Sequence, residues 1–288
     1  MKKVLFIVVT FNGMRWLERC LSSIPVEAGI FIVDNDSTDG SADFVTAHFP
    51  RARVVRSAEN LLFAKANNLG HRYALEKGYD YVYLMNQDAW LEEGALERLV
   101  AAAEAHPEYA VLSPLQMTEG FTGMDREFGK ILRFAQHDRR NAQSDICPVS
   151  RVMAAHWLVP AGALRKIGLF NEDLFPLYGQ DDDWCNRARH FGMRIGIVPA
   201  ARGVHDRASR QESKEKIIRR NYFTGSLCRL CDLNRPLWER FLFVCLFTLV
   251  KSVKYRSFLP LKYFRELCSR LPEIRRTRRS AASGAWGI

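Results

Sequence analysis

The sequence predicts an α/β fold, with a mostly parallel, doubly wound sheet flanked by helices and a basic helical C-terminal region. Three observations predict it: apolar runs alternate with helix-like segments, polar residues follow those runs, and charge is unevenly divided. Residues 1–206 carry 23 Lys and Arg against 26 Asp and Glu, whereas residues 207–288 carry 19 against 6. We therefore expect a ligand-handling domain over 1–206 and a different kind of segment over 207–288.

Four apolar runs in the first half have the composition of buried strands, and four stretches between them have the length of helices. The predicted strands are Val4–Thr10, Gly29–Val33, Arg53–Arg56 and Tyr81–Met85, and the predicted helices are Met14–Ile24, Ser41–His48, Ala64–Lys77 and Glu93–His106. Strands that alternate with helices form parallel βαβ units with right-handed crossovers. In such sheets, ligands bind beyond the carboxyl ends of the strands.

The second half of the domain is less regular. Residues 115–150 are polar, and we expect loops there, with a β-ribbon that contacts substrate. Strands are expected over Ser150–Pro160 and Arg194–Pro199, with a helix over Ala161–Gly168.

Composition and motifs exclude several classes of protein. The apolar start of the chain is short, is followed by polar residues and lacks a cleavage site, so a buried strand fits better than a signal peptide. The seven cysteines form no regular framework, and we expect reduced thiols in a cytoplasmic protein. Neither G-x-x-x-x-G-K-[ST] nor G-x-G-x-x-G is present, which disfavours P-loop enzymes and dinucleotide-dependent dehydrogenases.

Polar residues follow the predicted strands at the edge where a ligand would bind. Asp34 follows the second strand, and a carboxylate there accepts hydrogen bonds from a base N–H or a ribose hydroxyl. The alternative is that the segment 34–41 is only a capped turn. Asp88 follows the fourth strand, and there it either holds a divalent ion that bridges two phosphates or caps the next helix.

Three adjacent carboxylates, Asp181, Asp182 and Asp183, lie between aromatic residues. Their repulsion raises the pKa of some of them, which suits one of them to remove a proton from an attacking hydroxyl. A helix start with a solvated acidic face is the alternative. His205 follows the last predicted strand and is either a metal ligand, a phosphate donor or a structural histidine.

In this order, the segments resemble the family-2 glycosyltransferases, which have the GT-A fold, a Rossmann-like, mostly parallel sheet flanked by helices. The resemblance spans about residues 3–206. It implies a catalytic domain over 1–206, with a nucleotide-sugar half over about 1–115 and an acceptor half over about 116–206. It is carried by Thr10/Asn12, Asp34/Ser37/Asp39/Gly40, Asn60-Leu61…Asn67, Asp88, Asp181–Trp184 and Val204-His205. The chain is most similar to bacterial members described as rhamnosyl- or galactofuranosyl-transferases.

The resemblance implies an inverting enzyme that moves a hexosyl or deoxyhexosyl unit from a UDP- or dTDP-sugar to a hydroxyl of a cell-surface polysaccharide or lipopolysaccharide. It implies that Asp181 is the catalytic base and that Asp88, helped by His205, binds Mg²⁺ or Mn²⁺. The implied nucleotide- and donor-binding residues are Thr10, Asn12, Asp34, Asp36, Asn67, Asn86 and Gln87. The implied acceptor-side residues are Tyr178, Asp182, Asp183 and Trp184.

Two positions depart from the family pattern. Asn86 stands where the first carboxylate of a D-x-D motif is expected, so Asp88 would carry more of the metal binding. Gln180 stands where family members often have Glu, so Asp182 and Asp183 compete with Asp181 for the role of base.

The basic C-terminal region contains an apolar run over 241–250 with Arg and Lys on both sides. A helix that spans a membrane needs about 20 apolar residues, so a helix lying in an anionic membrane surface fits better. We therefore expect a cytoplasmic protein, peripheral on the inner face of the cell membrane, near a lipid-linked acceptor. The alternatives are a helix packed on the catalytic domain or on a second copy in a homodimer. Nucleic-acid binding is not expected, because no recognised module accompanies the charge.

Two other functions remain open from the sequence. A nucleotidyltransferase that forms nucleotide sugars would hold phosphates and metal at the same sheet edge, although residues 10–15 make a poor Gly-rich basic loop. The second is a non-catalytic relative that binds a glycan or a nucleotide.

Overall fold

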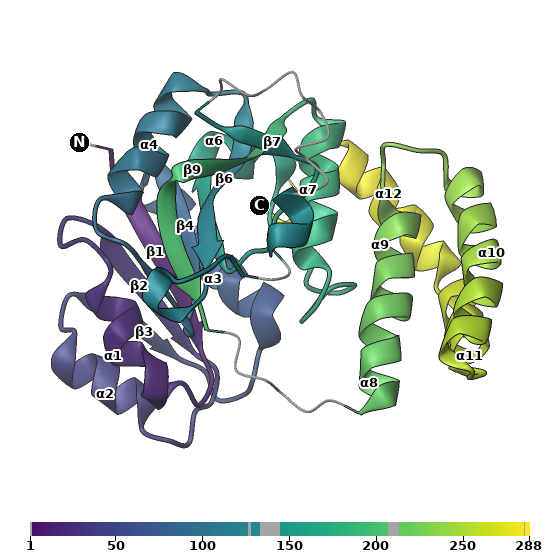
Figure 1. The fold of residues 1–288 in the computed structure, drawn as a ribbon, viewed down its shortest axis with the longest axis horizontal. Coiled ribbons are helices and arrows are strands. Elements are labelled where there is room, and N and C mark those ends of the chain that lie inside the picture. Colours follow the sequence, from purple (N-terminus) through teal and green to yellow (C-terminus); the bar gives the residue numbers. More distant parts are fainter. Residues whose placement is uncertain (1, 126–127, 133–144, 207–212, 285) are drawn as a thin grey trace.

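The computed structural model describes residues 2–125, 128–132, 145–206, 213–284 and 286–288. Its centre is a mixed sheet in the order β3-β2-β1-β4-β8-β6-β9-β5, with β7 paired to β9 (Figure 1). The strands are β1 Val4–Thr10, β2 Gly29–Asp34, β3 Ala52–Arg56, β4 Tyr81–Asn86, β5 Ala89–Leu91, β6 Tyr109–Met117, β7 Cys147–Val149, β8 His156–Pro160 and β9 Arg194–His205.

Helices cover both faces of this sheet, and further helices form the C-terminal region. They are α1 Met14–Ser22, α2 Ser41–His48, α3 Leu62–Glu76, α4 Ala95–Ala105, α6 Ala161–Ile167, α7 Gln180–His190, α8 Lys214–Ile218, α9 Gly225–Cys231, α10 Leu237–Tyr255, α11 Leu259–Ser269 and α12 Leu271–Ala282. A π-helical turn, η3 Arg219–Thr224, joins α8 to α9, and a 3-10 turn, η1 Glu119–Phe121, follows β6.

The four strands and four helices predicted in the first half are all present, and β1 to β4 are parallel to one another. Later strands differ: β8 runs antiparallel to both β4 and β6, and only His156–Pro160 of the predicted strand is extended. The sequence pattern does not predict β6, because Ser113, Pro114 and Gln116 interrupt its apolar run, nor does it predict the three-residue strand β5. Much of the predicted β-ribbon falls on 126–127 and 133–144, outside the described residues.

The strand order places three strand ends at one edge. From β1 the chain steps outward to β2 and β3, then returns to add β4 on the other side of β1. The register pairs Thr10 with Asp34 and Val9 with Asn86. The carboxyl ends of β1, β2 and β4 therefore open side by side at the point where the chain reverses its direction across the sheet, which is where such sheets bind ligands.

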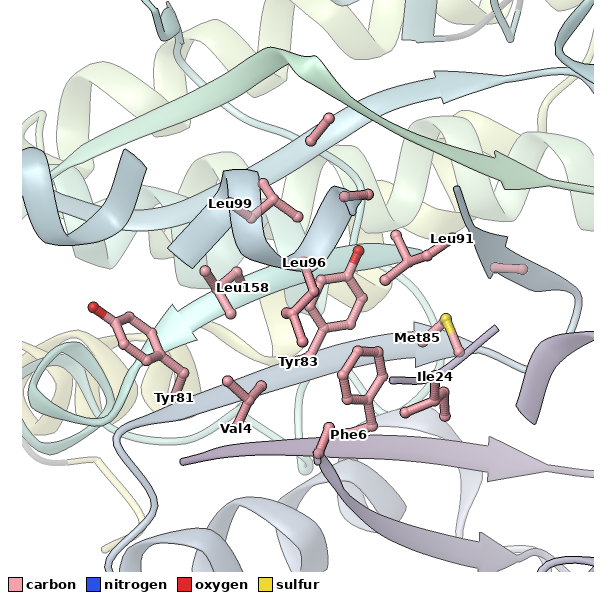
Figure 2. Packing of buried hydrophobic residues seen from close by; sticks show 14 of the residues in the cluster. Val4, Phe6, Ile24, Tyr81, Tyr83, Met85, Leu91, Leu96, Leu99 and Leu158 are labelled. Atoms are coloured by element: carbon pink, nitrogen blue, oxygen red, sulfur yellow. The ribbon is translucent and has the colours of Figure 1, made fainter. Parts of the chain in front are cut away.

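Alternate residues of β1 point into two separate cores, one on each face of the sheet. Val4, Phe6 and Val8 pack with residues of α1, α2 and α4, whereas Leu5 and Ile7 pack with residues of α3, α6 and α7. Figure 2 shows the first core, in which Phe6 stacks on Tyr83 with ring centroids 4.5 Å apart. Both faces are apolar, which explains why the parallel strands lack polar alternation.

The C-terminal region has a third core, formed by residues of η3 and α8 to α12 together with Leu174 and Phe175 from the loop before α7. The apolar run at 241–250 lies within α10, a helix of 19 residues. Among the helices of the described residues, none is long and apolar enough to cross a membrane.

Two glycines in helices provide a matched test of the packing of α3 on β1. A Cβ on Gly70 of α3 would lie 2.6 Å from Ile7 Cδ1, whereas a Cβ on Gly162 of α6 would have no atom within 4 Å. Gly70→Ala should lower the free energy of unfolding by about 1–2 kcal/mol, because overpacking outweighs the gain in helix propensity. Gly162→Ala should raise it by about 0.5–1 kcal/mol. Urea unfolding measures both, and the packing argument fails if both changes stabilise.

Candidate active site

Gln87 joins the carboxyl ends of β1 and β4. Its Oε1 accepts hydrogen bonds from the Thr10 hydroxyl and the Phe11 N–H, both at 2.9 Å, and its Nε2 donates to the Phe11 carbonyl at 3.3 Å. Thr10 is fully buried. The structure thus places Thr10 and Gln87 at the predicted edge, where their polar groups are engaged in holding two strand ends together.

The loops after β1 and β2 interlock at the exposed rim of this edge. The Asn12 N–H donates to Ser37 Oγ at 3.0 Å, and Asn12 Oδ1 accepts from the Thr38 N–H at 2.9 Å. Asn12 and Asp36 have φ values of 51° and 64°, a left-handed conformation that Asn and Asp tolerate better than most residues. Asp36 is exposed beside them.

Asp34 is the buried acidic group of this edge. Its Oδ2 accepts the Ser37 N–H at 3.2 Å, while its Oδ1 is buried and has no hydrogen-bond partner among the described residues. Buried polar atoms are nearly always hydrogen-bonded in folded proteins, so an unpaired acceptor needs an explanation. A ligand N–H or hydroxyl would supply the missing donor.

Asn67 lies inside the packing of α3, where its Nδ2 donates to the Phe63 carbonyl of the same helix at 2.8 Å. Its neighbour Asn68, which the sequence analysis missed, holds the loop that leads to α7. The Asn68 side chain accepts from the Phe170 N–H and donates to the Phe170 carbonyl, both at 3.0 Å. Asn68 is therefore a support of the loop, and a donor contact by Asn67 stays a prediction.

Asn86, Asp88 and His205 converge beyond the end of β4. His205 Nε2 lies 3.5 Å from both Asp88 Oδ1 and Asn86 Nδ2, and His205 Nδ1 is buried with no hydrogen-bond partner in the described part of the chain. No group of three or more His, Cys, Asp or Glu residues suited to a metal occurs within residues the structure describes. Two protein ligands nevertheless fit Mg²⁺ or Mn²⁺, because these ions keep water and substrate phosphate among their ligands.

A buried histidine supports the strand that carries His205. His156 Nε2 lies 2.9 Å from the Val204 carbonyl, which can only accept, so Nε2 carries the proton. His156 Nδ1 must then accept from the Tyr83 hydroxyl, 3.0 Å away. Burial lowers the pKa of His156 to about 4, which keeps it neutral. The sequence signal for this role was a lone His at the start of an apolar strand.

Asp206 fixes the same strand end from the other side. Its N–H donates to the Asp88 carbonyl at 2.8 Å, and its carboxylate accepts from Trp16 Nε1 at 2.8 Å. Trp16 belongs to α1, so the first helix helps to place the Asp88–His205 pair. The sequence analysis identified neither Trp16 nor Asp206, because their contact spans 190 positions of the chain.

The run of carboxylates begins α7. Asp182 forms an ion pair with Arg151 at 2.8 Å, and Asp181 Oδ1 accepts the Asp182 N–H at 2.9 Å. Asp181 keeps some exposed surface, yet burial, followed by repulsion from Asp182, raises its pKa to about 7. A carboxyl group with such a pKa is matched to proton transfer near neutral pH.

Asp183 and Trp184, expected on the acceptor side, instead lie in the core, because the helical period turns them inward. Asp183 accepts from Arg187 Nε at 2.9 Å, and both side chains are at most 4% exposed. Trp184 Nε1 donates to the Gly168 carbonyl at 2.8 Å, and its ring packs on Trp157. They hold α7 in place, so the competition for the role of base narrows to Asp181 and Asp182.

Tyr178 and Gly179 connect this helix to the C-terminal region. Tyr178 is 43% exposed, and the guanidinium of Arg220 lies 5.7 Å from its ring centroid. Gly179 has a φ of 86°, and a Cβ there would lie 2.6 Å from Thr224 Cγ2 and 2.8 Å from Cys228 Sγ. η3 and α9 therefore pack directly against the start of α7.

Known proteins resemble this chain in sequence. The model of the family "Glycosyl transferase family 2" matches residues 5–160. The dTDP-rhamnosyl transferase RfbF of Shigella flexneri is 21% identical over 206 residues, covering 69% of this chain and 67% of that protein. The N-acetylglucosaminyl-diphospho-decaprenol L-rhamnosyltransferase of Mycobacterium tuberculosis is 25% identical over 233 residues, covering 70% and 75%.

Solved structures resemble the fold. TarS 1–349 of S. aureus in complex with UDP-GlcNAc has a TM-score of 0.58 and 16% identity, covering 89% of this chain and 74% of that chain. The mannosyltransferase PcManGT of Pyrobaculum calidifontis in complex with GDP-Man and Mn²⁺ has a TM-score of 0.60 and 18% identity, covering 97% and 73%. The family match covers more than half of the chain, so the chain belongs to glycosyl transferase family 2 and is a glycosyltransferase with a GT-A fold.

Proposed function

We propose that this chain is an inverting glycosyltransferase that moves a hexosyl or deoxyhexosyl unit from a UDP- or dTDP-sugar to a hydroxyl of a cell-surface glycan. The observation that carries the proposal is the position of Asp181, a partly exposed carboxyl group in the first turn of α7, close in the chain to the exposed Tyr178. Its raised pKa fits the role of a base. One base suffices for an inverting displacement, since no protein nucleophile is needed. Family membership removes the support for the nucleotidyltransferase and non-catalytic alternatives.

The donor would bind at the edge formed by β1, β2 and β4. The unpaired Oδ1 of Asp34 would accept the ring N–H of uracil or thymine, and the loops of Asn12 and Asp36 would border the nucleotide. RfbF is named a dTDP-rhamnosyl transferase, and the TarS structures contain UDP and UDP-GlcNAc, so pyrimidine nucleotides are the first donors to test. A rhamnosyl unit is our preferred sugar.

Asp88 and His205 would hold a divalent ion, with Asn86 beside them. Such an ion, when bound, neutralises charge on the leaving diphosphate. The solved structure of PcManGT contains Mn²⁺ together with GDP-Man, which supports this assignment for the fold. In this chain, His156, Tyr83 and Asp206 would keep the two ligands in position through the contacts described above.

Asp181 would take the proton from the acceptor hydroxyl as that oxygen attacks the sugar. Tyr178 and Asp182 would border the acceptor, with Asp182 held by Arg151. The M. tuberculosis relative is named for an N-acetylglucosaminyl-diphospho-decaprenol acceptor. For this chain we propose a glycan acceptor of the polysaccharide or lipopolysaccharide type, free or lipid-linked. Transfer would take place at the inner face of the cell membrane.

Replacing the proposed base should abolish transfer without loss of donor binding. Asp181→Asn should reduce kcat by about 10²- to 10⁴-fold, because a positioned base contributes that much to catalysis. The Kd for UDP or dTDP should be unchanged. Released nucleoside diphosphate is measured across a panel of nucleotide sugars with Mg²⁺ or Mn²⁺ and a lipid-linked acceptor. If no nucleotide sugar binds or turns over, the proposal is wrong.

The pH dependence tests the electrostatics around the base. Asp181 must be ionised to act, so activity should rise with pH through the pKa of about 7. Asp182→Asn removes a charge that raises this pKa and should move the acidic limb to lower pH. Arg151→Met removes a charge that lowers it and should move the limb to higher pH. Shifts of kcat profiles in the same direction would contradict Asp181 as the titrating group.

Substitutions at two positions of the proposed metal site should change the affinity for Mn²⁺ in opposite directions. Asp88→Asn should weaken Mn²⁺ binding in the presence of UDP or dTDP by at least about tenfold, because a charged oxygen ligand is lost. Asn86→Asp should tighten it, since it supplies a second carboxylate beside His205. Electron paramagnetic resonance of free Mn²⁺ measures both without turnover. Asp43→Asn, on the exposed surface of α2, is the control and should change nothing. If Mn²⁺ binding is unaltered in Asp88→Asn, Asp88 is not a metal ligand and the proposed metal site is wrong.

A further inference from the structure

The outer face of α10 is apolar and uncovered. Its exposed apolar side chains follow one another at helical spacing, and each is at least 45% exposed: Trp238, Leu242, Phe243, Leu246, Leu249, Val250 and Val253. The opposite side of the helix contains the buried Val244 and Thr248. The helix is therefore amphipathic, with one side packed on the protein and the other in contact with solvent. We call the exposed side the outer face of α10.

The start of α11 continues this apolar surface in the chain. Phe258 is 85% exposed and Leu261 is 41% exposed, directly after α10 ends. Figure 1 shows α9 between the sheet and α10, so the outer face of α10 points away from the catalytic domain. A row of exposed apolar side chains along one face of a helix marks an interaction site rather than ordinary surface.

The charge beside this surface is mostly positive. Residues 240–265 contain six Lys and Arg and no Asp or Glu, and Glu239, in the first turn of α10, lies 3.8 Å from Arg235. Lys254, Arg256 and Lys262 are exposed, and within the described chain none of them forms an ion pair. A second copy docked face to face would bring these like charges together, with Glu239 as the one acidic residue of α10 to neutralise them, which disfavours a homodimer at this surface.

We propose that the outer face of α10, with Phe258 and Leu261, is the surface by which the protein docks on an anionic lipid bilayer. The apolar side chains would enter the boundary between headgroups and acyl chains, and the lysines and arginines would lie among anionic headgroups. This surface would account for the membrane location that the proposed function includes. The inference rests on the proposed function only for the choice of the inner leaflet. Vesicle binding does not require the donor or the acceptor.

Flotation of the full chain with vesicles, without nucleotide, tests the proposal. The vesicles contain phosphatidylcholine alone or with phosphatidylglycerol. Wild-type protein should float with the anionic vesicles and much less with the neutral ones. Leu246→Glu with Leu249→Glu should reduce partitioning to anionic vesicles by about tenfold or more, because two exposed leucines that would enter the bilayer are lost. Lys254→Glu with Lys262→Glu should reduce it by about tenfold and should leave neutral vesicles unaffected.

Val26→Glu is the matched control, since Val26 is 87% exposed on another surface, and it should float like the wild type. The midpoint of thermal unfolding and the Kd for UDP or dTDP should be unchanged in all variants. A loss of vesicle binding is then distinguished from a loss of folding or of nucleotide binding. Wild-type protein that stays unbound, or leucine and lysine variants that float normally, would overturn the proposal. Sedimentation equilibrium showing a wild-type dimer that the leucine variant dissociates would assign the surface to a second copy instead.

Discussion

The edge at which β1, β2 and β4 end side by side is the constraint on which the rest of the site depends. Because β4 joins the side of β1 opposite β2, the loops after all three strands must meet there. The register then sets Asp34 level with Thr10 and Asn86 level with Val9. Gln87 locks two of the ends together, and Asp206 ties the last strand to Asp88. The polar sheet edge and the Asp88–His205 pair are thus consequences of a single strand order.

Helical geometry separates the three aspartates at the start of α7. Three adjacent aspartates at the start of α7 would repel one another if all faced the same way. The turn of the helix distributes them among three environments: Asp183 pairs with Arg187 in the core, Asp182 pairs with Arg151 near the surface, and Asp181 keeps a raised pKa. Three carboxylates that are alike in the sequence therefore differ in burial, in ion-pair partner and in pKa.

The local pattern of the sequence determined the first half of the fold, because each apolar run there is a complete strand between helices. It located the polar strand ends for the same reason. It missed β6, whose apolar run contains Pro114 and Gln116, and it missed partners that are distant in the chain, such as Trp16 with Asp206 or His156 with Tyr83. It also placed Trp184 on the acceptor side, since burial of one face of α7 depends on helices and loops that no local pattern encodes. Side-chain roles that depend on tertiary contacts can be assigned only when the fold is known.

The close approach of Gly179 to Thr224 and Cys228 has a consequence for how such enzymes diversify. The residue before α7 leaves no room for a side chain, because η3 and α9 occupy that space, and the two regions also share Leu174 and Phe175 in one core. The C-terminal region is therefore not an interchangeable module. A chimera that takes the residues after 206 from another family member should keep this packing only if the loop at 174–179 is exchanged with them.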